Sequence, residues 1–397
     1  MTTTAVRPTS ASLLVVGSGP AGVAAAKGFR DAGGEGDVMV LSADTAMPYE
    51  RPPLSKDFLR GDSHASDIGI ENDSFYRDQR IVMELETRVR SLNPSTRTVE
   101  LSDGRMLGYQ TCVLATGAEP RRLDVPGGDD SRVLLLRSLA DASRLVAAAD
   151  NARSAIVVGS GFIGCEAAAS LASRGLEVTL VTDEDTPHAK RLGADIGARI
   201  VKWLRAAGVE LITGASIQQI EEARRVRLDG GDHVAADLIL TAVGVRPRVD
   251  IAQRAGLVID KDRIAVDQQM RTSATGVLAA GDVTYPYNAR AGRRLVVEHW
   301  GDAELMGRIA GSTAAGHPEQ WAQSPGFWST IGDRTLKYAA WGDGFDEVAV
   351  AEHTDGFTAW YRQDGVVVGV LTHERDEDYE RGRTLVEGAA PLGSGSV

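Results

Sequence analysis

The chain contains few of the residues that disulfide, metal and membrane chemistry require. Of its 397 residues only two are cysteines, Cys112 and Cys165, and they lie far apart in the sequence. They cannot build a disulfide framework, so we expect small buried residues in a reducing compartment, which favours a cytoplasmic protein. The seven histidines are scattered without the spacing of metal ligands, so we expect no metal site.

Long apolar runs and an excess of basic residues are also missing. No apolar run approaches the ~18 residues of a membrane-spanning helix, and the first ten residues lack the apolar region of a signal peptide. The formal net charge of −12 argues against nucleic acid, because proteins that bind it present a broad basic surface. We therefore expect neither a membrane nor a nucleic acid as partner. Glycine, by contrast, is abundant at 44 residues, which suggests tight turns and backbone that approaches ligands.

A pattern of strand, glycine-rich turn, helix and strand occurs twice. The first copy begins with the valine- and leucine-rich run 12–17, continues through an alanine-rich helix and ends with a strand over 37–44. The second copy begins with the run 154–159 and ends with a strand over 176–183. The two copies lie further apart than the about 20–50 residues of a solenoid repeat, so the pattern predicts two separate nucleotide-binding domains.

Both turns carry the motif GxGxxG, as Gly17-Ser18-Gly19-Pro20-Ala21-Gly22 and as Gly159-Ser160-Gly161-Phe162-Ile163-Gly164. In this motif the first glycine permits the turn, the second lets backbone approach a pyrophosphate, and the third lets helix and strand pack closely. The helix N-terminus then offers free N–H groups and about half a positive charge to the phosphates. Two such motifs predict two dinucleotides, a flavin and a nicotinamide.

Further apolar runs predict where the chain crosses between domains. The segments 112–121 and 238–248 each contain an apolar strand that ends in glycine, and Pro-Arg follows shortly after. We interpret both segments as domain crossings. The run 275–284 is predicted to be a buried strand that ends in Gly281 and Asp282. An acid at the end of a buried strand can accept hydrogen bonds from a ribityl chain.

The character of the chain changes from about Trp321. Runs of alternating polarity predict antiparallel strands, with a hairpin turn at Asp364-Gly365. The segment 378–389 predicts a closing helix, and the tail 391–397 is predicted to be disordered.

These elements predict an α/β fold with two Rossmann-like dinucleotide-binding domains and a C-terminal α+β domain. We expect a discontinuous FAD-binding domain over 1–118 and 247–320. The NAD(P)-binding domain is expected over 119–246 and the C-terminal domain over 321–397.

Five short motifs occur in the order PYERPPLSK, ATGAEPR, IGCE, AAGDV and EHW. In this order they resemble the FAD-dependent reductases of ferredoxins and rubredoxins. Apoptosis-inducing factor shares the fold, which is glutathione-reductase-like. The resemblance covers essentially the whole chain, and it implies FAD and NADH as cofactors.

The resemblance also implies the residues of the two cofactor sites. Lys56 would lie near the reactive edge of the flavin with Glu166 as its partner, and Trp300 would be an aromatic near the flavin. These three are our catalytic candidates. The FAD site would comprise Gly17, Gly19, Pro20, Ala21, Gly22, Asp44, Arg51, Lys56, Val89, Ala115, Thr116, Gly117, Arg121, Gly281, Asp282, Glu298, His299 and Trp300. The NAD site would comprise Gly159, Gly161, Phe162, Ile163, Gly164, Glu166, Asp183 and Gly244.

Both ribose positions depart from the family pattern. Ala43 stands where an acid usually binds the adenosine ribose of FAD, and we expect the neighbouring Asp44 to substitute for it. Thr182 stands where an acid usually selects NADH. We expect Asp183 to accept from the ribose 2′-hydroxyl and to repel a 2′-phosphate, which favours NADH over NADPH.

The function that follows is transfer of a hydride from NADH to FAD and of single electrons to a [2Fe-2S] ferredoxin or a rubredoxin that feeds an oxygenase. Flavin suits this task because it takes up two electrons and can release them one at a time. The stretch 288–295 supplies Arg290, Arg293 and Arg294 as candidates to dock an acidic iron–sulfur partner. The protein could be a monomer or a homodimer.

Two other functions remain open. One is an NADH oxidase or diaphorase that passes electrons to oxygen or quinones. The other is a redox-sensing flavoprotein like apoptosis-inducing factor. Disulfide reduction is disfavoured, because the loop 43–53 after the first nucleotide-binding pattern contains no cysteine.

Overall fold

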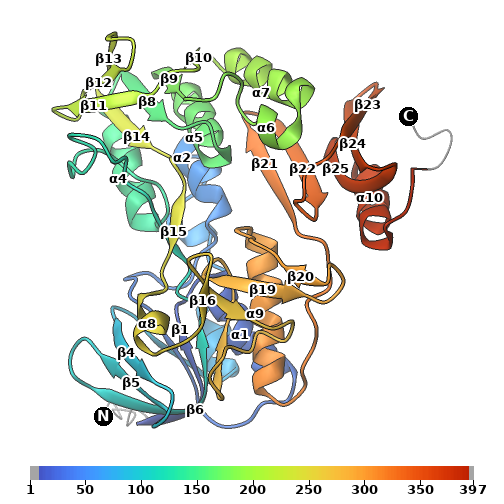
Figure 1. The fold of residues 1–397 in the computed structure, drawn as a ribbon. Helices are drawn as coiled ribbons and strands as arrows, with labels where there is room; N and C mark the ends of the chain where they lie inside the picture. The colour runs from blue at the N-terminus through green and yellow to red at the C-terminus, as the bar shows by residue number, and fades with distance from the viewer. Residues whose placement is uncertain (1–8, 393–397) are drawn as a thin grey trace. The chain divides into compact units, whose positions relative to one another are not determined.

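The structure is a computed structural model in which residues 9–392 are described, and their contacts divide the chain into two compact units (Figure 1). Unit 1 comprises residues up to Glu50, Gly69–Ala118 and Pro247–Gly326. Unit 2 comprises Arg51–Ile68, Glu119–Arg246 and the chain from Phe327 onward. The loop with the paired prolines therefore belongs to unit 2, although the segments on both sides of it belong to unit 1.

Unit 1 contains a sheet in which the strands β3, β2, β1, β6 and β18 are parallel, with β6 pairing β1 on one side and β18 on the other. The strands β4 and β5 extend the sheet antiparallel from the first part of β6. Their bounds are β1 Ser10–Val16, β2 Val38–Leu41, β3 Ile81–Glu84, β4 Val89–Asn93, β5 Thr98–Leu101, β6 Met106–Leu114 and β18 Val277–Ala279. The β1 run Leu13–Val15 is fully buried, as a strand covered on both faces requires.

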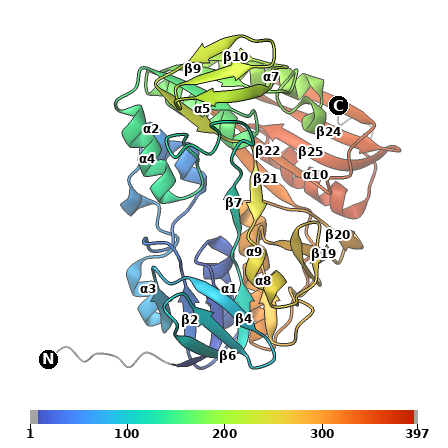
Figure 2. The same ribbon diagram turned by 60° about the vertical axis from the view of Figure 1, so that its left-hand side comes forward.

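Two long helices of unit 1, α1 (Pro20–Asp31) and α9 (Trp300–Ala314), lie side by side (Figure 2). Glycines permit this approach. A Cβ on Gly307 would lie 2.2 Å from the carbonyl oxygen of Ala21, and one on Gly311 would lie 2.1 Å from that of Ala25. The short helices of this unit are α3 Asp73–Asp78 and α8 Asp250–Arg254.

A second, smaller sheet of unit 1 has the order β16, β17, β19, β20. The bounds are β16 Ile259–Asp260, β17 Arg263–Val266, β19 Thr284–Asn288 and β20 Arg293–Arg294. The chain passes between the units at β7 (Ala118–Pro120) and β15 (Val245–Pro247), which pair with each other. Both expected crossing segments are thus strands.

Unit 2 repeats the parallel arrangement on a smaller scale, with the sheet order β10, β9, β8, β14. Its strands are β8 Ser154–Val158, β9 Glu177–Val181, β10 Val209–Ile212 and β14 Leu238–Thr241. Its helices are η1 Pro52–Ser55, α2 Asp57–Arg60, η2 Ala65–Asp67, α4 Leu139–Ala149, α5 Phe162–Ser173, α6 Ala189–Leu192 and α7 Ala194–Ala206. A three-stranded antiparallel sheet follows, with β11 Ile217–Glu221, β12 Arg225–Leu228 and β13 His233–Ala235.

The C-terminal part of unit 2 is an antiparallel sheet in the order β21, β22, β25, β24, β23, with helix α10 packed against it (Figure 1). The bounds are β21 Gly326–Ile331, β22 Arg334–Ala340, β23 Glu347–His353, β24 Gly356–Gln363, β25 Val366–His373 and α10 Asp376–Gly388. The predicted hairpin turn is confirmed, because Asp364 and Gly365 have φ of +51° and +78° between β24 and β25. Positive φ at both residues matches a type I′ turn.

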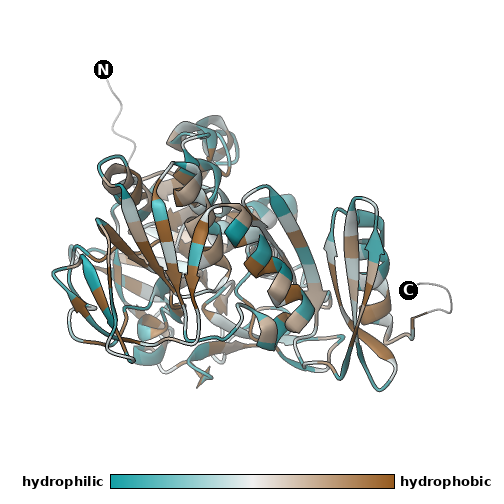
Figure 3. Cartoon of the chain, turned by 90° about the horizontal axis from the view of Figure 1, so that it is seen from above, coloured by the Kyte–Doolittle hydropathy of each residue, from teal (hydrophilic) through white to brown (hydrophobic). Residues whose placement is uncertain are grey.

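Hydrophobic residues gather on the strands and helices, while many connecting loops are hydrophilic (Figure 3). In unit 2 one buried cluster joins Leu171 of α5 and Leu180 of β9 to Tyr361 and Leu371 of the C-terminal sheet. The nucleotide-binding sheet and the C-terminal sheet therefore share a core. The predicted closing helix is confirmed as α10, whereas most of the tail predicted to be disordered, from 393 onward, lies outside the described residues.

Among residues 9–392, no helix combines the length and the apolar character that crossing a membrane would need.

Candidate functional sites

The first glycine-rich turn is built so tightly that side chains cannot replace its outer glycines. Gly17 follows β1 with φ of +112°, and a Cβ there would lie 2.2 Å from the carbonyl oxygen of Ala115. A Cβ on Gly22 would lie 1.9 Å from the carbonyl oxygen of Gly17. Real Cβ atoms do not approach an oxygen so closely, so both positions require glycine for steric reasons.

The helix that follows this turn has an N-terminus available to an anion. Gly19 is the N-cap of α1 and Pro20 its first residue, and none of the described side chains caps the helix. Helix α4, by comparison, is closed by a capping box between Ser138 and Asp141. Uncapped N–H groups at a glycine-rich helix start fit the pyrophosphate of a dinucleotide.

The second turn repeats this geometry. Gly159 follows β8 with φ of +102°, and a Cβ on Gly164 would lie 2.0 Å from the carbonyl oxygen of Gly159. Around Gly161, the N-cap of α5, no heavy atom of the described chain beyond its immediate chain neighbours lies within 4 Å of where a Cβ would stand. That open space, together with a helix start that no described side chain caps, fits a second pyrophosphate.

A pair of hydroxyl groups ties each turn to the strand beside it. In unit 1 the Ser18 and Ser42 hydroxyls lie 2.6 Å apart, and in unit 2 the Ser160 and Thr182 hydroxyls lie 2.8 Å apart. Ser42 and Thr182 each come directly after the second strand of their nucleotide-binding pattern. In unit 2 the bracing residue, Thr182, is also the one that stands at the usual acid position, whereas in unit 1 Ser42 directly precedes that position, Ala43.

Asp44, the predicted substitute acid of the FAD site, is oriented by its own loop. Its Oδ2 accepts from the Tyr49 hydroxyl at 2.8 Å, and its Oδ1 accepts from the main-chain N–H of Ala46 at 3.2 Å. The side chain of Ala43 is exposed. The carboxylate of Asp44 therefore stands at the expected end of β2 in a defined orientation.

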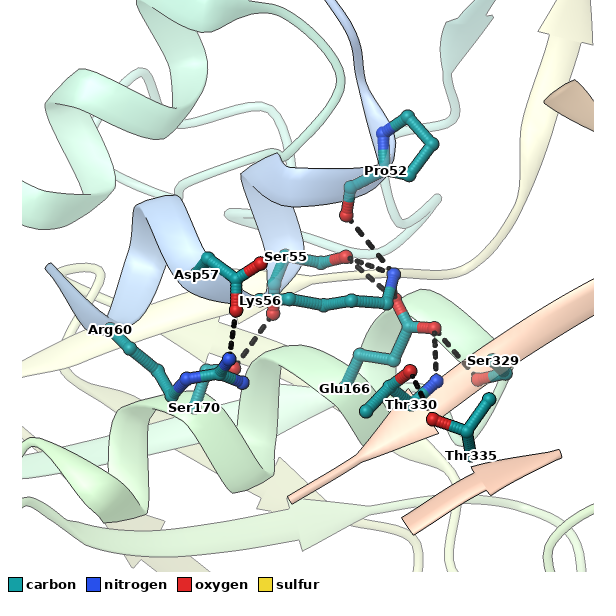
Figure 4. Close-up of polar contacts among 10 residues, drawn as sticks. All are labelled: Pro52, Ser55, Lys56, Asp57, Arg60, Glu166, Ser170, Ser329, Thr330 and Thr335. Atoms are coloured by element: carbon teal, nitrogen blue, oxygen red, sulfur yellow. Dashed lines mark hydrogen bonds and ion pairs between the residues drawn. The ribbon is translucent and has the colours of Figure 1, made fainter. Parts of the chain in front are cut away.

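Lys56 and Glu166 form a buried ion pair within unit 2 (Figure 4). The Lys56 Nζ lies 2.7 Å from Glu166 Oε2, and the two residues are 9% and 2% exposed. Lys56 Nζ also donates to the Pro52 carbonyl oxygen at 3.0 Å, so the proline loop helps to hold the ammonium group. The contact predicted by resemblance is present in the structure.

The Glu166 carboxylate has three further partners (Figure 4). The Ser55 hydroxyl donates to Oε2 at 2.6 Å, while the Ser329 hydroxyl and the Thr330 N–H donate to Oε1 at 2.7 and 3.3 Å. With all its partners supplied, the carboxylate avoids the large cost of an unpaired buried charge. Sequence reasoning missed Ser329, because nothing in the sequence relates β21 to a helix more than 150 residues earlier. Ser55, by contrast, lies inside the RPPLSK motif, which could have indicated it.

The other residues predicted to bind FAD in unit 1 lie at strand ends and at the start of α9. Gly281 follows β18 with φ of +80°, and Asp282 is half-buried. Glu298 pairs with the buried Arg263, so it serves partly as a structural ion pair. The remaining positions are His299 (N-cap of α9), Trp300 (first residue of α9), Val89 (start of β4), and Ala115, Thr116 and Gly117 (after β6).

Three predicted FAD-site residues, Arg51, Lys56 and Arg121, belong to unit 2. Arg51 directly precedes η1, and Arg121 donates through Nε to the Val245 carbonyl oxygen at 2.9 Å. On the NAD side, Gly244 has φ of +94° and accepts from the Arg121 N–H at 2.9 Å. The turn after β14 is thereby fixed to the segment of Arg121.

The NAD-site acid named from the sequence is less well placed than its neighbour. Asp183 is exposed, and no hydrogen bond of its carboxylate is present within residues 9–392. Glu184, one residue further, accepts from the Ser160 hydroxyl at 2.9 Å and from the His188 N–H at 3.1 Å. Sequence reasoning passed over Glu184, because a run of three acids does not show which one turns back toward the glycine-rich turn.

Neither cysteine is suited to redox chemistry. Cys112 lies within β6 and Cys165 within α5, both are fully buried, and neither forms a disulfide. Burial raises the pKa of the Cys112 thiol to about 12. Burial, with a smaller contribution from the Glu166 carboxylate, also raises the pKa of Cys165. A thiol must ionise to act as a nucleophile, so both are inert.

The predicted docking arginines differ in how they are used. Arg294 donates through Nη1 to the carbonyl oxygens of Val266 and Tyr285, the latter at 2.8 Å, which ties β20 to the strands β17 and β19 of its own sheet. Arg290 is exposed, and Arg293 is half-buried. The neighbouring Val296 is 52% exposed.

Within the described chain, no group of three or more histidine, cysteine, aspartate or glutamate side chains is arranged to hold a metal ion.

Comparison with known proteins identifies the family. Residues 11–307 match the family described as pyridine nucleotide-disulphide oxidoreductase, and residues 326–396 match the family described as reductase C-terminal. Ferredoxin–NAD(P)+ reductase from a Sphingomonas species is 31% identical, over 96% of this chain and 94% of its own length. Apoptosis-inducing factor 3 from Homo sapiens is 29% identical over 92% of this chain, which spans only 61% of that protein's length.

Solved structures agree with the sequence comparison. The structure described as the covalent putidaredoxin reductase–putidaredoxin complex matches with a TM-score of 0.90 at 28% identity, covering 96% of this chain and 94% of that chain. The predicted resemblance and the predicted fold class are therefore confirmed. This chain belongs to the pyridine nucleotide-disulphide oxidoreductase family, whose members use FAD and NADH, and it carries that family's reductase C-terminal domain.

Proposed function

We propose that the protein is an FAD-dependent NAD(P)H:ferredoxin-type reductase. It takes electrons from NADH and passes them to a [2Fe-2S] ferredoxin or a rubredoxin that serves an oxygenase. The observation that carries the proposal is the combination of two dinucleotide cradles with only two cysteines, both buried and unpaired. Electrons that enter from a nicotinamide have no disulfide to reduce in this chain, so they leave to an external acceptor. The Sphingomonas relative is named for that reaction.

The residues assigned to the two cofactors have distinct tasks. The α1 and α5 N-termini bind the pyrophosphates, and Asp44 binds the adenosine ribose of FAD. When bound, FAD supplies the conversion between two-electron hydride chemistry and one-electron transfer. Lys56, positioned by Glu166, would supply a fixed positive charge to the FAD site, and Trp300 would supply an aromatic side chain to it. This chemistry requires no side chain to act as a nucleophile.

The domain assignment follows from these roles. We assign residues 1–118 and 247–320 to the FAD-binding domain, 119–246 to the NAD(P)-binding domain and 321–397 to the C-terminal domain. Within the segment 1–118, the loop Arg51–Ile68 packs with unit 2. The two free cysteines support a reducing, cytoplasmic location.

We assign the docking of an acidic iron–sulfur partner to Arg290 and Arg293, with the exposed Val296 as the apolar centre of the patch and Arg294 as its internal brace. In the related complex the named partner is putidaredoxin. For the double variant Arg290→Glu/Arg293→Glu we expect roughly tenfold slower ferredoxin reduction at low salt, because reversed charges repel an acidic partner. A neutral quinone, which does not need a basic docking surface, should be reduced at the wild-type rate.

The matched control for this test is the double variant Lys202→Glu/Arg205→Glu, which reverses two exposed cations on α7 and so makes the same change in net charge. Steady-state rates at several salt concentrations provide the measurement. An equal loss in the control, or a wild-type rate that does not depend on salt, would contradict the docking assignment.

Anaerobic stopped-flow spectroscopy tests the proposed function as a whole. The purified protein should be yellow, and NADH should bleach the visible flavin band quickly. Mixing the reduced protein with a ferredoxin should restore that band faster than mixing it with air-saturated buffer. Faster recovery with oxygen or a quinone would favour an oxidase or diaphorase. Very slow bleaching with a persistent long-wavelength band would favour a redox sensor, the function that the similarity to apoptosis-inducing factor 3 keeps open.

A further inference from the structure

The adenosine end of the second dinucleotide cradle lacks an acid at the position where such cradles usually carry one. Thr182, the residue directly after β9, is 4% exposed, and its hydroxyl is engaged with that of Ser160. A buried threonine can accept a hydrogen bond from a ribose hydroxyl, but it cannot repel a 2′-phosphate. Discrimination between the two nicotinamide dinucleotides must therefore come from another residue.

Glu184 is the acid that the fold directs back to the glycine-rich turn. Its carboxylate accepts from the hydroxyl of Ser160, the residue between Gly159 and Gly161, at 2.9 Å. It also accepts from the main-chain N–H of His188 at 3.1 Å, which closes the loop between β9 and α6. The chain thus places this carboxylate beside the turn at whose helix a pyrophosphate fits.

One oxygen of this carboxylate remains available to a ligand. Both hydrogen bonds use Oε2, and within residues 9–392 no donor contacts Oε1. Glu184 is half-buried and forms no ion pair with the described residues. Its Oε1 can therefore accept from a hydroxyl group while Oε2 stays anchored.

The side chains of His188 and Arg191 do not neutralise the Glu184 carboxylate. The ring of His188 stacks on Phe162 at 4.0 Å, and its burial lowers the pKa of His188 to about 4. This imidazole is therefore neutral at neutral pH. Arg191 lies over the Phe162 and Phe327 rings, at 5.6 and 5.1 Å from their centroids, so its guanidinium is used for cation–π contacts.

We infer that Glu184, and not Asp183, is the residue that accepts from the ribose 2′-hydroxyl of NADH and excludes the 2′-phosphate of NADPH. The inference rests on the proposed function only in assigning this cradle to a nicotinamide dinucleotide. It predicts a protein specific for NADH through an acid two residues beyond the usual position. Phe162 and the Ser160 hydroxyl would contact the same dinucleotide beside Glu184.

Isothermal titration calorimetry with the FAD-loaded full chain tests this inference without turnover. The probes are ADP-ribose and 2′-phospho-ADP-ribose, which lack the nicotinamide and differ only in the phosphate. The wild type should bind ADP-ribose more tightly. In Glu184→Gln the amide oxygen can still accept from Ser160 and His188, but the charge is lost. The ratio of the two dissociation constants should then fall by about ten- to a hundredfold, the size expected for a charged contact.

Asp183→Asn is the matched control, since it removes the same charge one residue away. It should leave the ratio within about twofold of the wild type, because exposed charges are screened by salt. An unchanged ratio in Glu184→Gln, or an equal change in Asp183→Asn, overturns the inference while the dinucleotide site itself stands. A wild type that binds neither probe would instead overturn the proposed function of this cradle.

Discussion

The two glycine-rich cradles share one backbone but differ in the side chains that surround it. Gly22 and Gly164 fill the same steric role, and a hydroxyl pair braces each turn. Beyond the second strand they diverge, because the Asp44 carboxylate is held by its own loop whereas that of Glu184 reaches back to the turn. The steric requirements of the turn fix the backbone, while recognition of each dinucleotide is left to the loops.

The helices that start at the two cradles differ in the same way. Two residues after Gly164 helix α5 carries the buried Glu166, whereas two residues after Gly22 helix α1 carries Ala24. Helix α1 instead packs against α9 through contacts that only glycine allows. One helix is thus specialised for a charged pair and the other for close packing.

The largest effects on cofactor binding and stability are expected when the third glycine of either motif is replaced. In Gly22→Ala and Gly164→Ala the new Cβ would lie 1.9 and 2.0 Å from a backbone oxygen, so the turn must open. We expect Gly22→Ala to lose FAD and Gly164→Ala to keep FAD but lose NAD+ binding, each with a loss of stability of about 1–3 kcal/mol or more. Flavin absorbance, calorimetric titration and thermal unfolding measure the three effects.

Gly161→Ala is the control for this prediction, since its Cβ meets open space and its φ of −61° suits any residue. It should unfold at the wild-type temperature and still bind NAD+ less well, because the Cβ occupies space next to the pyrophosphate. Equal stability of Gly22→Ala and wild type would show that the turn is more adaptable than its geometry indicates.

Breaking the ion pair between Lys56 and Glu166 should lower the stability nearly as much as replacing a glycine of the turns. Lys56→Met removes the cation from a carboxylate that is 2% exposed, which leaves a buried charge with neutral donors only. Breaking one partner of a buried pair costs about 3–5 kcal/mol. Urea unfolding of the flavin-loaded protein gives the measurement. Lys27 on α1 forms an exposed ion pair with Glu71, and Lys27→Met should change stability by less than about 1 kcal/mol.

His188, which lies beside the second cradle, should make the free energy of unfolding depend on pH. Its pKa of about 4 in the fold lies below the ordinary value of about 6.5, because the ring is buried. A depressed pKa means that the unfolded chain takes up the proton first. The neutral His188 ring therefore makes its full contribution to the free energy of unfolding above pH ~6.5. The free energy of unfolding then falls by on the order of 3 kcal/mol as the pH falls toward 4.

Unfolding experiments between pH 7 and 4.5 check this expectation against His188→Phe, which keeps a ring beside Phe162. The variant should lose less stability than the wild type as the pH falls. Parallel curves for the two proteins would mean that His188 does not titrate as its burial requires.

The smallest effects should come from the hydroxyl pairs. Ser18→Ala removes only its bond to Ser42, whereas Ser160→Ala also removes a donor to Glu184. A neutral hydrogen bond contributes about 0.5–1.5 kcal/mol and one to a charged group about 1.5–3 kcal/mol. We therefore expect the second variant to be the less stable by thermal unfolding. The reverse order would contradict the contact between Ser160 and Glu184.

The sequence predicts local geometry well and contacts between distant segments poorly. The glycine motifs and the Asp364-Gly365 turn are readable because backbone sterics leave few alternatives at these positions. Ser329 was not predictable, because its role depends on β21 lying beside α5. Glu184 was not predictable from a run of three acids, because only the folded loop decides which side chain turns inward. The ion pair of Lys56 and Glu166 was found only through the resemblance to a family.

The contact between α1 and α9 has a consequence for how the protein can be made. Gly28, Gly307 and Gly311 bring two segments from opposite ends of unit 1 to backbone distance. A nascent chain that has emerged only as far as the first nucleotide-binding pattern therefore exposes a bare, alanine-rich helix face and waits for α9. The face of α1 that Gly307 and Gly311 contact can therefore be buried only once the chain has been synthesised through α9.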